Sequence, residues 1–164
     1  MKNVFFLLFT SLFLGACSSN PRTSSSEINV VELNYGICDM DIVSSIPLNN
    51  APTGEHRISK NFKIFKKTDV IPCITDQSFG VSYVVNSNEK KNVSLQVKWT
   101  FPEAVTNEKG ERFAQTDYTE NVITNEVRHS TYTLGEKYLE VKGDWKFELF
   151  SHGEKLYEKK FRLN

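Results

Sequence analysis

Apolar and polar residues alternate along most of the chain after residue 28, and this period of two predicts β-strands. The clearest stretch runs from Val93 to Phe101, where every odd position is apolar and every even position is polar. Such a strand places one face in a core and the other in water. Phe79–Val85 repeats the alternation, and a polar segment over residues 86–92 separates the two stretches. We therefore expect them to form a hairpin.

Six further segments carry a β-strand signal, and prolines, glycines or polar residues separate them. Spaced short strands with polar turns are typical of an antiparallel sandwich. No amphipathic helix is indicated, and Gly135–Val141 is the one segment that suits a single helical turn. We predict an all-β, immunoglobulin-like β-sandwich of about seven to eight strands over residues 28–164. The six segments are Ile28–Ile37, His56–Phe65, Tyr118–Ile123, Ser130–Leu134, Trp145–Leu149 and Leu156–Leu163.

Large aromatic residues concentrate in the alternating strands. Exposed aromatic rings on a sheet can form a platform on which sugars stack. Strict alternation indicates instead that these rings share the buried face of each strand. We therefore predict that five of them belong to the core: Trp99, Phe101, Trp145, Phe147 and Phe161.

The first residues have the pattern of an export signal. Lys2 supplies a positive charge, and the apolar run from Val4 to Leu14 follows it, interrupted by two hydroxyl residues. This is the order of a charged and then an apolar region in a signal peptide. A membrane-spanning helix needs about 20 apolar residues, so the run is too short to be one. Residues 1–16 are predicted to be a signal peptide.

The end of that run resembles the lipobox of bacterial lipoproteins. Leu14, Gly15 and Ala16 give a branched apolar residue and two small ones before Cys17. A cysteine buried in an apolar helix is the alternative, and the position of the triplet at the end of the apolar run argues against it. The resemblance implies a diacylglyceryl thioether on Cys17, cleavage before it, and acylation of the new amine. Several acyl chains of the palmitate type anchor a protein stably to a membrane.

A serine-rich segment without apolar residues follows Cys17. Such a sequence cannot bury enough surface to order itself, so residues 17–27 are predicted to be a flexible tether. Ser18, rather than an aspartate, follows the cysteine. In the sorting rule of enteric lipoproteins this favours the outer membrane. We expect a lipid-anchored protein of the bacterial cell envelope, with its periplasmic or surface orientation left open.

Composition limits the classes of partner. The chain has 20 basic and 20 acidic residues and a formal net charge of zero. It has no basic excess and no lysine–arginine stripe to neutralise phosphates, so we expect no nucleic-acid partner. The membrane, through the lipid anchor, and an envelope protein are the expected partners. The oligomeric state is left open.

Two cysteines, Cys38 and Cys73, fall within the predicted sandwich. In an exported domain an even pair is expected to form a disulfide. Two buried free thiols or a metal site are the alternatives. A metal site would need nearby histidines, and His56, His129 and His152 show no ligand spacing to the cysteines. We expect the disulfide and no metal.

No catalytic motif is visible in the sequence. It has no Gly-x-Ser-x-Gly elbow, no His-Glu-x-x-His and no phosphate-binding glycine loop. Asp39 and Asp41 share a strand face and could bind calcium or act as an acid–base pair, but no further oxygen ligands lie at close spacing, so a solvated edge strand or turn is the favoured interpretation. The histidines have the character of ordinary surface residues. We predict no catalytic residue, no cofactor and no enzymatic activity.

From Tyr35 to Asn164 the chain resembles a bacterial family catalogued as a domain of unknown function, number 3859. The resemblance implies an exported β-sandwich, and it supplies no activity. The segments that carry it are Tyr35–Ile37, Ile71–Pro72, Phe79–Tyr83, Val97–Pro102, Gly143–Leu149 and Phe161.

The sequence thus favours a non-catalytic binding or assembly accessory module. Its working parts would be a sheet edge or loops such as Asn49–Gly54 and Asn107–Arg112, because loops on a rigid scaffold carry function. The alternative is an inhibitor of a secreted or periplasmic enzyme, with a loop closed by Cys38 and Cys73. A hydrolase with a dispersed site is a third hypothesis.

Overall fold

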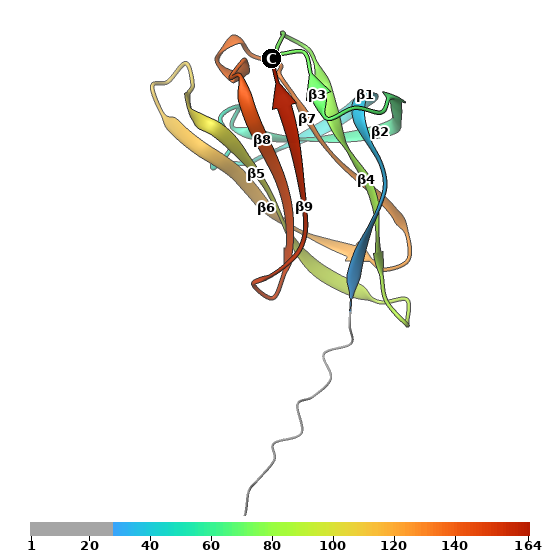
Figure 1. Cartoon of the computed structure of the whole chain (residues 1–164). Coiled ribbons are helices and arrows are strands. Elements are labelled where there is room, and N and C mark those ends of the chain that lie inside the picture. The colour runs from blue at the N-terminus through green and yellow to red at the C-terminus, as the bar shows by residue number, and fades with distance from the viewer. Residues whose placement is uncertain (1–27) are drawn as a thin grey trace, which may run out of the picture.

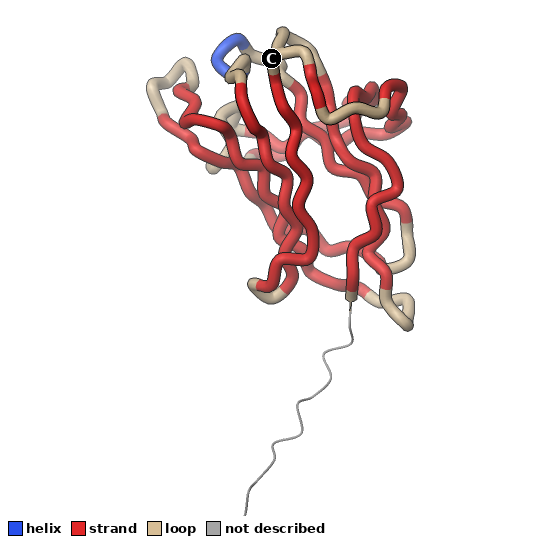
Figure 2. Tube along the Cα trace, viewed as in Figure 1, coloured by secondary structure: helices blue, strands red, loops and turns tan. Residues whose placement is uncertain are grey.

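The computed structural model describes residues 28–164, which form two β-sheets packed face to face (Figures 1 and 2). One sheet has four strands in the order β2-β1-β4-β7, and the other has five in the order β3-β9-β8-β5-β6. Neighbouring strands are antiparallel except β3 and β9. The predicted all-β sandwich is confirmed. The predicted signal peptide, the lipidation site Cys17 and the tether lie outside the described residues.

The strands differ widely in length. Within residues 28–164 no helix is long and apolar enough to cross a membrane. The elements in chain order are β1 (Asn29–Pro47), β2 (Glu55–Lys66), β3 (Val70–Ile71), β4 (Ser78–Asn86), β5 (Asn92–Thr106), β6 (Arg112–Ile123), β7 (Val127–Thr133), the 3-10 helix η1 (Lys137–Leu139), β8 (Gly143–Ser151) and β9 (Glu154–Leu163).

Every strand expected from the alternation is a strand in the structure, and η1 is the single helical turn expected within Gly135–Val141. The two-residue strand β3 was not predicted, because two residues are too few to show a period. The return from β8 to β9 is a two-residue hairpin. Its central residues, His152 and Gly153, have φ of 51° and 82°, the left-handed values that such turns require.

The expected hairpin between Phe79–Val85 and Val93–Phe101 is wrong. β4 pairs with β1 and β7, whereas β5 pairs with β6 and β8 in the other sheet. The polar segment between them therefore carries the chain from one sheet to the other. The apolar faces of the two strands point at each other across the core, as the edge-to-face contact of Phe79 with Trp99 at 5.6 Å shows.

The core is a layer of aromatic rings between the sheets. Phe79 of the four-stranded sheet meets the ring edges or faces of Trp99, Trp145 and Phe161 of the other, at centroid distances of 5.1–5.9 Å. The five aromatics predicted from the sequence are all buried, each with at most 5% of its surface exposed. Burial of each such side chain contributes about 1.5–3 kcal/mol, so this layer stabilises the contact between the two sheets.

Strand β1 belongs to two different pairings. Its first half, to Ile37, pairs with β4, and its second half, from Ile37 to Pro47, pairs only with β2. Three register shifts interrupt the second pairing, and such bulges bend and twist a strand. Residues 37–66 therefore leave the sheet as a two-stranded arm, which we call the ribbon. Figure 1 shows it behind the sandwich, reaching from β4 towards β6.

The ribbon crosses the side of the sandwich where β7 and β6, the edge strands of the two sheets, lie next to each other. Beside β7, Ser59 Oγ lies 3.3 Å from His129 Nε2. At the ribbon tip, Asn50 Nδ2 donates to the backbone oxygen of Asp117 in β6 at 2.6 Å. The ribbon thus joins the two sheets across their otherwise open side.

Candidate binding pocket under the ribbon

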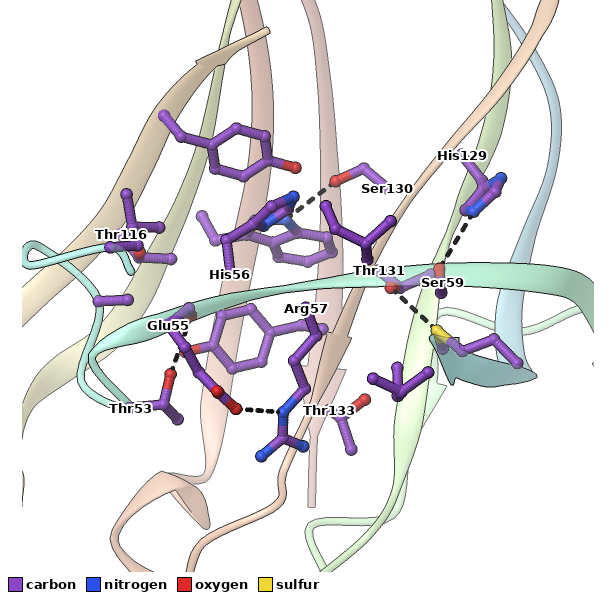
Figure 3. A pocket seen from close by; sticks show the side chains of 18 of the residues that line it. Thr53, Glu55, His56, Arg57, Ser59, Thr116, His129, Ser130, Thr131 and Thr133 are labelled. Carbon is purple, nitrogen blue, oxygen red and sulfur yellow. Dashed lines mark hydrogen bonds and ion pairs between the residues drawn. The ribbon is translucent and has the colours of Figure 1, made fainter. Parts of the chain in front are cut away.

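The ribbon covers a pocket of about 390 Å³, which we call the ribbon pocket. Figure 3 shows β2 running across it, with side chains of β6 and β7 on the other side. The residues that matter for its chemistry are Glu55, His56, Arg57 and Ser59 from β2, Thr116, Tyr118 and Glu120 from β6, and Arg128, His129, Ser130 and Thr131 from β7.

Both faces of β7 line the pocket. Successive side chains of a strand point to opposite faces. Ser130 therefore points into the sandwich, where it bonds Trp99, while His129 and Thr131 point to the outer face of the sheet. Because the ribbon bends around this edge strand, the pocket continues from one face to the other.

A hydrogen-bonded network forms the inner wall. Trp99 Nε1 donates to Ser130 Oγ at 3.2 Å, and Ser130 also bonds the Tyr118 hydroxyl. Burial raises the pKa of Tyr118, so its hydroxyl stays protonated. Beside it, Arg128 Nη2 donates to Glu120 Oε2 at 3.0 Å. These contacts hold the wall rigid.

The charges of the pocket are paired. Glu120 accepts from Arg128, and on the ribbon Arg57 Nε donates to Glu55 Oε1 at 2.7 Å. The hydrogen bond from Arg57 holds the pKa of Glu55 below its usual range. Two carboxylates and two guanidinium groups therefore balance each other.

Two histidines, expected to be ordinary surface residues, are half-buried in this pocket. The His56 ring lies 4.2 Å from that of Tyr118, and the His129 ring stacks on Phe62 at 4.5 Å. Burial lowers the pKa of each; the charge of Glu120 opposes this at His56, and Arg128 reinforces it at His129. Both rings are therefore neutral at pH 7.

Two polar atoms in the pocket lining have no hydrogen-bond partner among residues 28–164. Thr116 is 6% exposed and its Oγ1 is unpaired, and the buried Nε of Arg128 is unpaired as well. Buried polar groups in folded proteins are nearly always bonded to protein or to an ordered molecule. These atoms are therefore positions at which an ordered water or a bound molecule would complete the hydrogen bonding.

A second cavity, of about 370 Å³, lies at the ribbon tip. It is lined by the two loops that the sequence analysis singled out, and the structure brings them together. Asn107 Nδ2 donates to the backbone oxygen of Pro52 at 3.2 Å, and the Tyr138 hydroxyl donates to the same oxygen at 3.4 Å. The loops hold the ribbon tip in place.

Cys38 and Cys73 are two free, buried thiols in the structure, so the expected disulfide is not shown. They lie in different surroundings. Cys38 pairs with Ile64 in the ribbon, while the amide of Cys73 donates to the carbonyl of Asn164 and its side chain joins the main core. Burial raises the pKa of Cys38 to about 12 and also raises that of Cys73. This bond was the only feature that favoured the inhibitor hypothesis, and the structure does not show it.

The Asp39 and Asp41 pair lies on the exposed outside of the ribbon. Asp39 accepts a hydrogen bond from the amide of Met40, and Asp41 accepts one from Asn61 Nδ2 at 2.6 Å. Across residues 28–164 no three histidine, cysteine or acidic side chains lie close enough to hold a metal ion. The pair therefore has the surroundings of a solvated edge.

Sequence reasoning missed the residues that define the ribbon pocket. One signal was present: the inward positions of β6 alternate polar and apolar residues, namely Thr116, Tyr118, Glu120 and Val122. Polar residues on the core side of a strand indicate that the core there is not purely apolar and can border a polar site. The strand expected from the sequence begins at Tyr118, whereas β6 begins at Arg112, so Thr116 falls outside the expected strand.

The two facing sheets define the protein as an immunoglobulin-like β-sandwich. An immunoglobulin-like protein from Pseudomonas aeruginosa superposes with a TM-score of 0.62, at 17% sequence identity, covering 86% of this chain and 99% of that one. Residues 26–163 match the family described as Domain of unknown function (DUF3859), and the chain belongs to that family. No curated protein sequence matches the chain.

Two enzymes resemble the chain more weakly. The alkylpurine DNA glycosylase AlkC of Pseudomonas fluorescens gives a TM-score of 0.37 at 15% identity, covering 58% of this chain and 28% of that one. A β-glucosidase from Listeria innocua gives 0.36 at 12% identity, covering 79% and 16%. Both similarities involve a small part of a much larger protein, and neither carries an argument about function.

Proposed function

We propose that this protein is a non-catalytic binding or assembly accessory module of the bacterial cell envelope, and that the ribbon pocket is its binding site. The observation that carries the proposal is the pair of buried, unpartnered atoms in the pocket lining, Thr116 Oγ1 and Arg128 Nε. An unmet hydrogen bond costs about 1–3 kcal/mol when its atom is buried. A ligand that bonds these atoms recovers that energy.

The chemistry of the pocket favours binding over catalysis. Ser59 and His129 form a serine–histidine contact, which is the first requirement of a nucleophile and its base. A third group should orient the histidine, but the pocket carboxylates bond Arg57 and Arg128 instead. His129 stacks on Phe62, a contact that fixes its ring without activating it.

The course of the chain fits attachment to the membrane at the end of the sandwich that lies away from the ribbon. Strand β1 begins at one end of the sandwich, and the ribbon lies in the other half, towards the C-terminus (Figure 1). Anchoring through Cys17 and the segment that follows it would therefore leave the ribbon pocket facing away from the membrane. A binding module held in this way presents its site to other envelope components.

Photo-crosslinking in intact cells tests the proposal. A photoreactive amino acid replaces Val127, which lines the pocket and is 67% exposed, or Val70, a control on β3 that is 45% exposed. We expect one envelope component to crosslink at Val127 and not at Val70. A Cys17→Ala form of the same full chain should lose most of this product. No specific product at Val127, or the same product at Val70, would contradict the proposal.

A further inference from the structure

We propose that the ligand of the ribbon pocket is an uncharged saccharide, held by hydrogen bonds to Thr116, Arg128 and His56. The inference rests on the proposed function, because it assigns a chemical class to the ligand of that site. Three properties of the pocket carry it: its charge balance, the type of its unpartnered polar groups, and its limited size.

The charge balance selects an uncharged ligand. The Glu55–Arg57 and Glu120–Arg128 pairs, at 2.7 and 3.0 Å, neutralise each other within the lining. The histidines add no charge at pH 7, since burial lowers their pKa values. An ion entering this partly buried site would lose hydration and find no unpaired charge of opposite sign. The pocket therefore discriminates against acids and amines.

The unpartnered groups match hydroxyls. The Thr116 hydroxyl both donates and accepts, and Arg128 Nε only donates. The ring nitrogens of His56, whose pKa is set by burial and by the charge of Glu120, supply one donor and one acceptor in the neutral form. A sugar hydroxyl can donate and accept at once, so neighbouring hydroxyls of one ring can serve all three groups.

The pocket also has apolar surface for the C–H faces of a sugar ring. Met40, Ile42, Leu48 and Ile58 of the ribbon line it beside the polar groups. A mixture of apolar surface and a few directed polar groups is typical of small-molecule sites. A saccharide has both kinds of surface on one rigid ring.

The limited size of the pocket restricts the size of the ligand. The ribbon is fixed at its tip by Asn50 against Asp117 and near its middle by Ser59 against His129. These contacts bound the space in length, and its volume is about 390 Å³. This suits a compact molecule of about one or two sugar rings rather than an extended polymer passing through.

The experiment measures sugar binding by the full chain, purified in detergent, with isothermal titration calorimetry and saturation-transfer NMR. The neutral probes are glucose, N-acetylglucosamine, maltose, cellobiose and chitobiose; the charged probes are glucuronic acid and glucosamine. We expect at least one neutral sugar to bind and both charged sugars to bind at least tenfold more weakly.

Two threonine variants of β6 make the test specific. Thr116→Val removes the pocket hydroxyl and keeps the shape, and we expect the affinity for the neutral sugar to fall about tenfold, the loss of one hydrogen bond. Thr119→Val, an exposed position on the same strand, should leave the affinity unchanged. Thr116→Val should melt at the same or a higher temperature, because it removes a buried hydroxyl that has no partner.

The inference is overturned if no neutral sugar binds, if a charged sugar binds as well as the neutral ones, or if Thr116→Val binds as tightly as the native chain. If the sugars fail while the crosslink at Val127 persists, the binding module stands and its ligand is of another class. If both fail, the proposed function falls with the inference.

Discussion

Gly36 marks the residue at which β1 begins to leave β4 for β2. Its φ is +136°, a value that side chains other than glycine rarely adopt. A Cβ at this position would lie 2.1 Å from the carbonyl oxygen of Lys66 and 2.9 Å from the amide nitrogen of Thr68. The end of β2 therefore packs directly on the glycine backbone, and the base of the ribbon depends on this contact.

We predict that Gly36→Ala lowers the free energy of unfolding by about 2–4 kcal/mol, because both the backbone angle and the space disfavour a side chain. Urea denaturation of the full chain measures it. Gly54→Ala in the ribbon turn is the matched control: its φ is +73° and nothing lies within 4 Å, so a cost of about 1 kcal/mol is expected. Equal costs at the two positions would contradict the close approach at Gly36.

The burial of an individual residue could be predicted from the sequence where the alternation of its own strand determines which face it lies on. Trp99 and Phe147 alternate strictly with polar neighbours, and both are buried. The inward place of Thr116 was visible in the alternation of β6, but the pocket around Thr116 and Arg128 was not predictable, because it is formed by a ribbon that is distant in sequence. Their role follows from the long-range crossing of β2 over β7 and β6, which no local period encodes.

The ribbon differs from the other strands in how it is held to the body. No ladder joins β2 to β7 among the described residues, and side-chain contacts take its place. The Thr131 hydroxyl donates to Met40 Sδ at 3.3 Å, and Ser59 contacts His129. Each such contact contributes about 1 kcal/mol. Within residues 28–164, opening the ribbon therefore breaks side-chain contacts with β6 and β7 but no backbone ladder with them.

We predict that Asn50→Ala loosens the ribbon without unfolding the sandwich. The variant loses the bonds from Asn50 Nδ2 to the backbone oxygen and the carboxylate of Asp117. Loss of about 1 kcal/mol should speed hydrogen exchange of amides 48–60 about fivefold while those of β5 stay unchanged. Asn88→Ala, at an exposed turn elsewhere, is the control. A uniform acceleration over all strands would contradict a separately opening ribbon.

The mispairing of β4 and β5 shows what strand patterns leave undetermined. Both strands have one apolar face, and that pattern is the same whether two strands lie side by side or face each other. Phe79 and Trp99 meet across the core, so the connection at residues 86–92 is a crossover between sheets. The bulges that bend β1 could not be predicted from the sequence pattern either, because one extra residue in a strand leaves its strand signal intact.

At the scale of the whole molecule, the outer face of the five-stranded sheet is a network of charges. Glu148 on β8 is 3% exposed and lies 2.9, 3.4 and 3.5 Å from the Nζ atoms of Lys98, Lys146 and Lys155. Burial pushes its pKa upwards, but the lysines hold the pKa below its usual range. This carboxylate therefore stays ionised at neutral pH and stabilises the sheet until strongly acidic conditions protonate it.

We predict that mild acid destabilises the whole domain through His56 and His129. Burial lowers both pKa values in the folded state, so below about pH 6.5 the unfolded chain binds protons first. The free energy of unfolding should therefore fall as the pH is lowered from 7.5 to 5.5. Glutamates whose pKa is lowered in the folded state, such as Glu148, affect the free energy of unfolding only below about pH 4.5. That lies outside the range from pH 7.5 to 5.5.

Urea denaturation at the two pH values measures the effect. The double variant His56→Gln with His129→Gln should lose most of the difference. His152→Asn, in the β8–β9 turn, is the control outside the pocket and suits the positive φ of that position. A pH dependence that survives the double variant would assign it to other groups.

The path of the ribbon also bears on how such molecules behave when they are crowded. Sheets grow by adding strands at uncovered edges, which is the usual route to aggregation. Here the ribbon lies across β6 and β7, and β3 covers the end of β9. The outer strand of the ribbon carries Lys60, Lys63 and Lys66, whose charges repel a neighbouring strand. Many copies at high density would therefore meet without polymerising through their sheets.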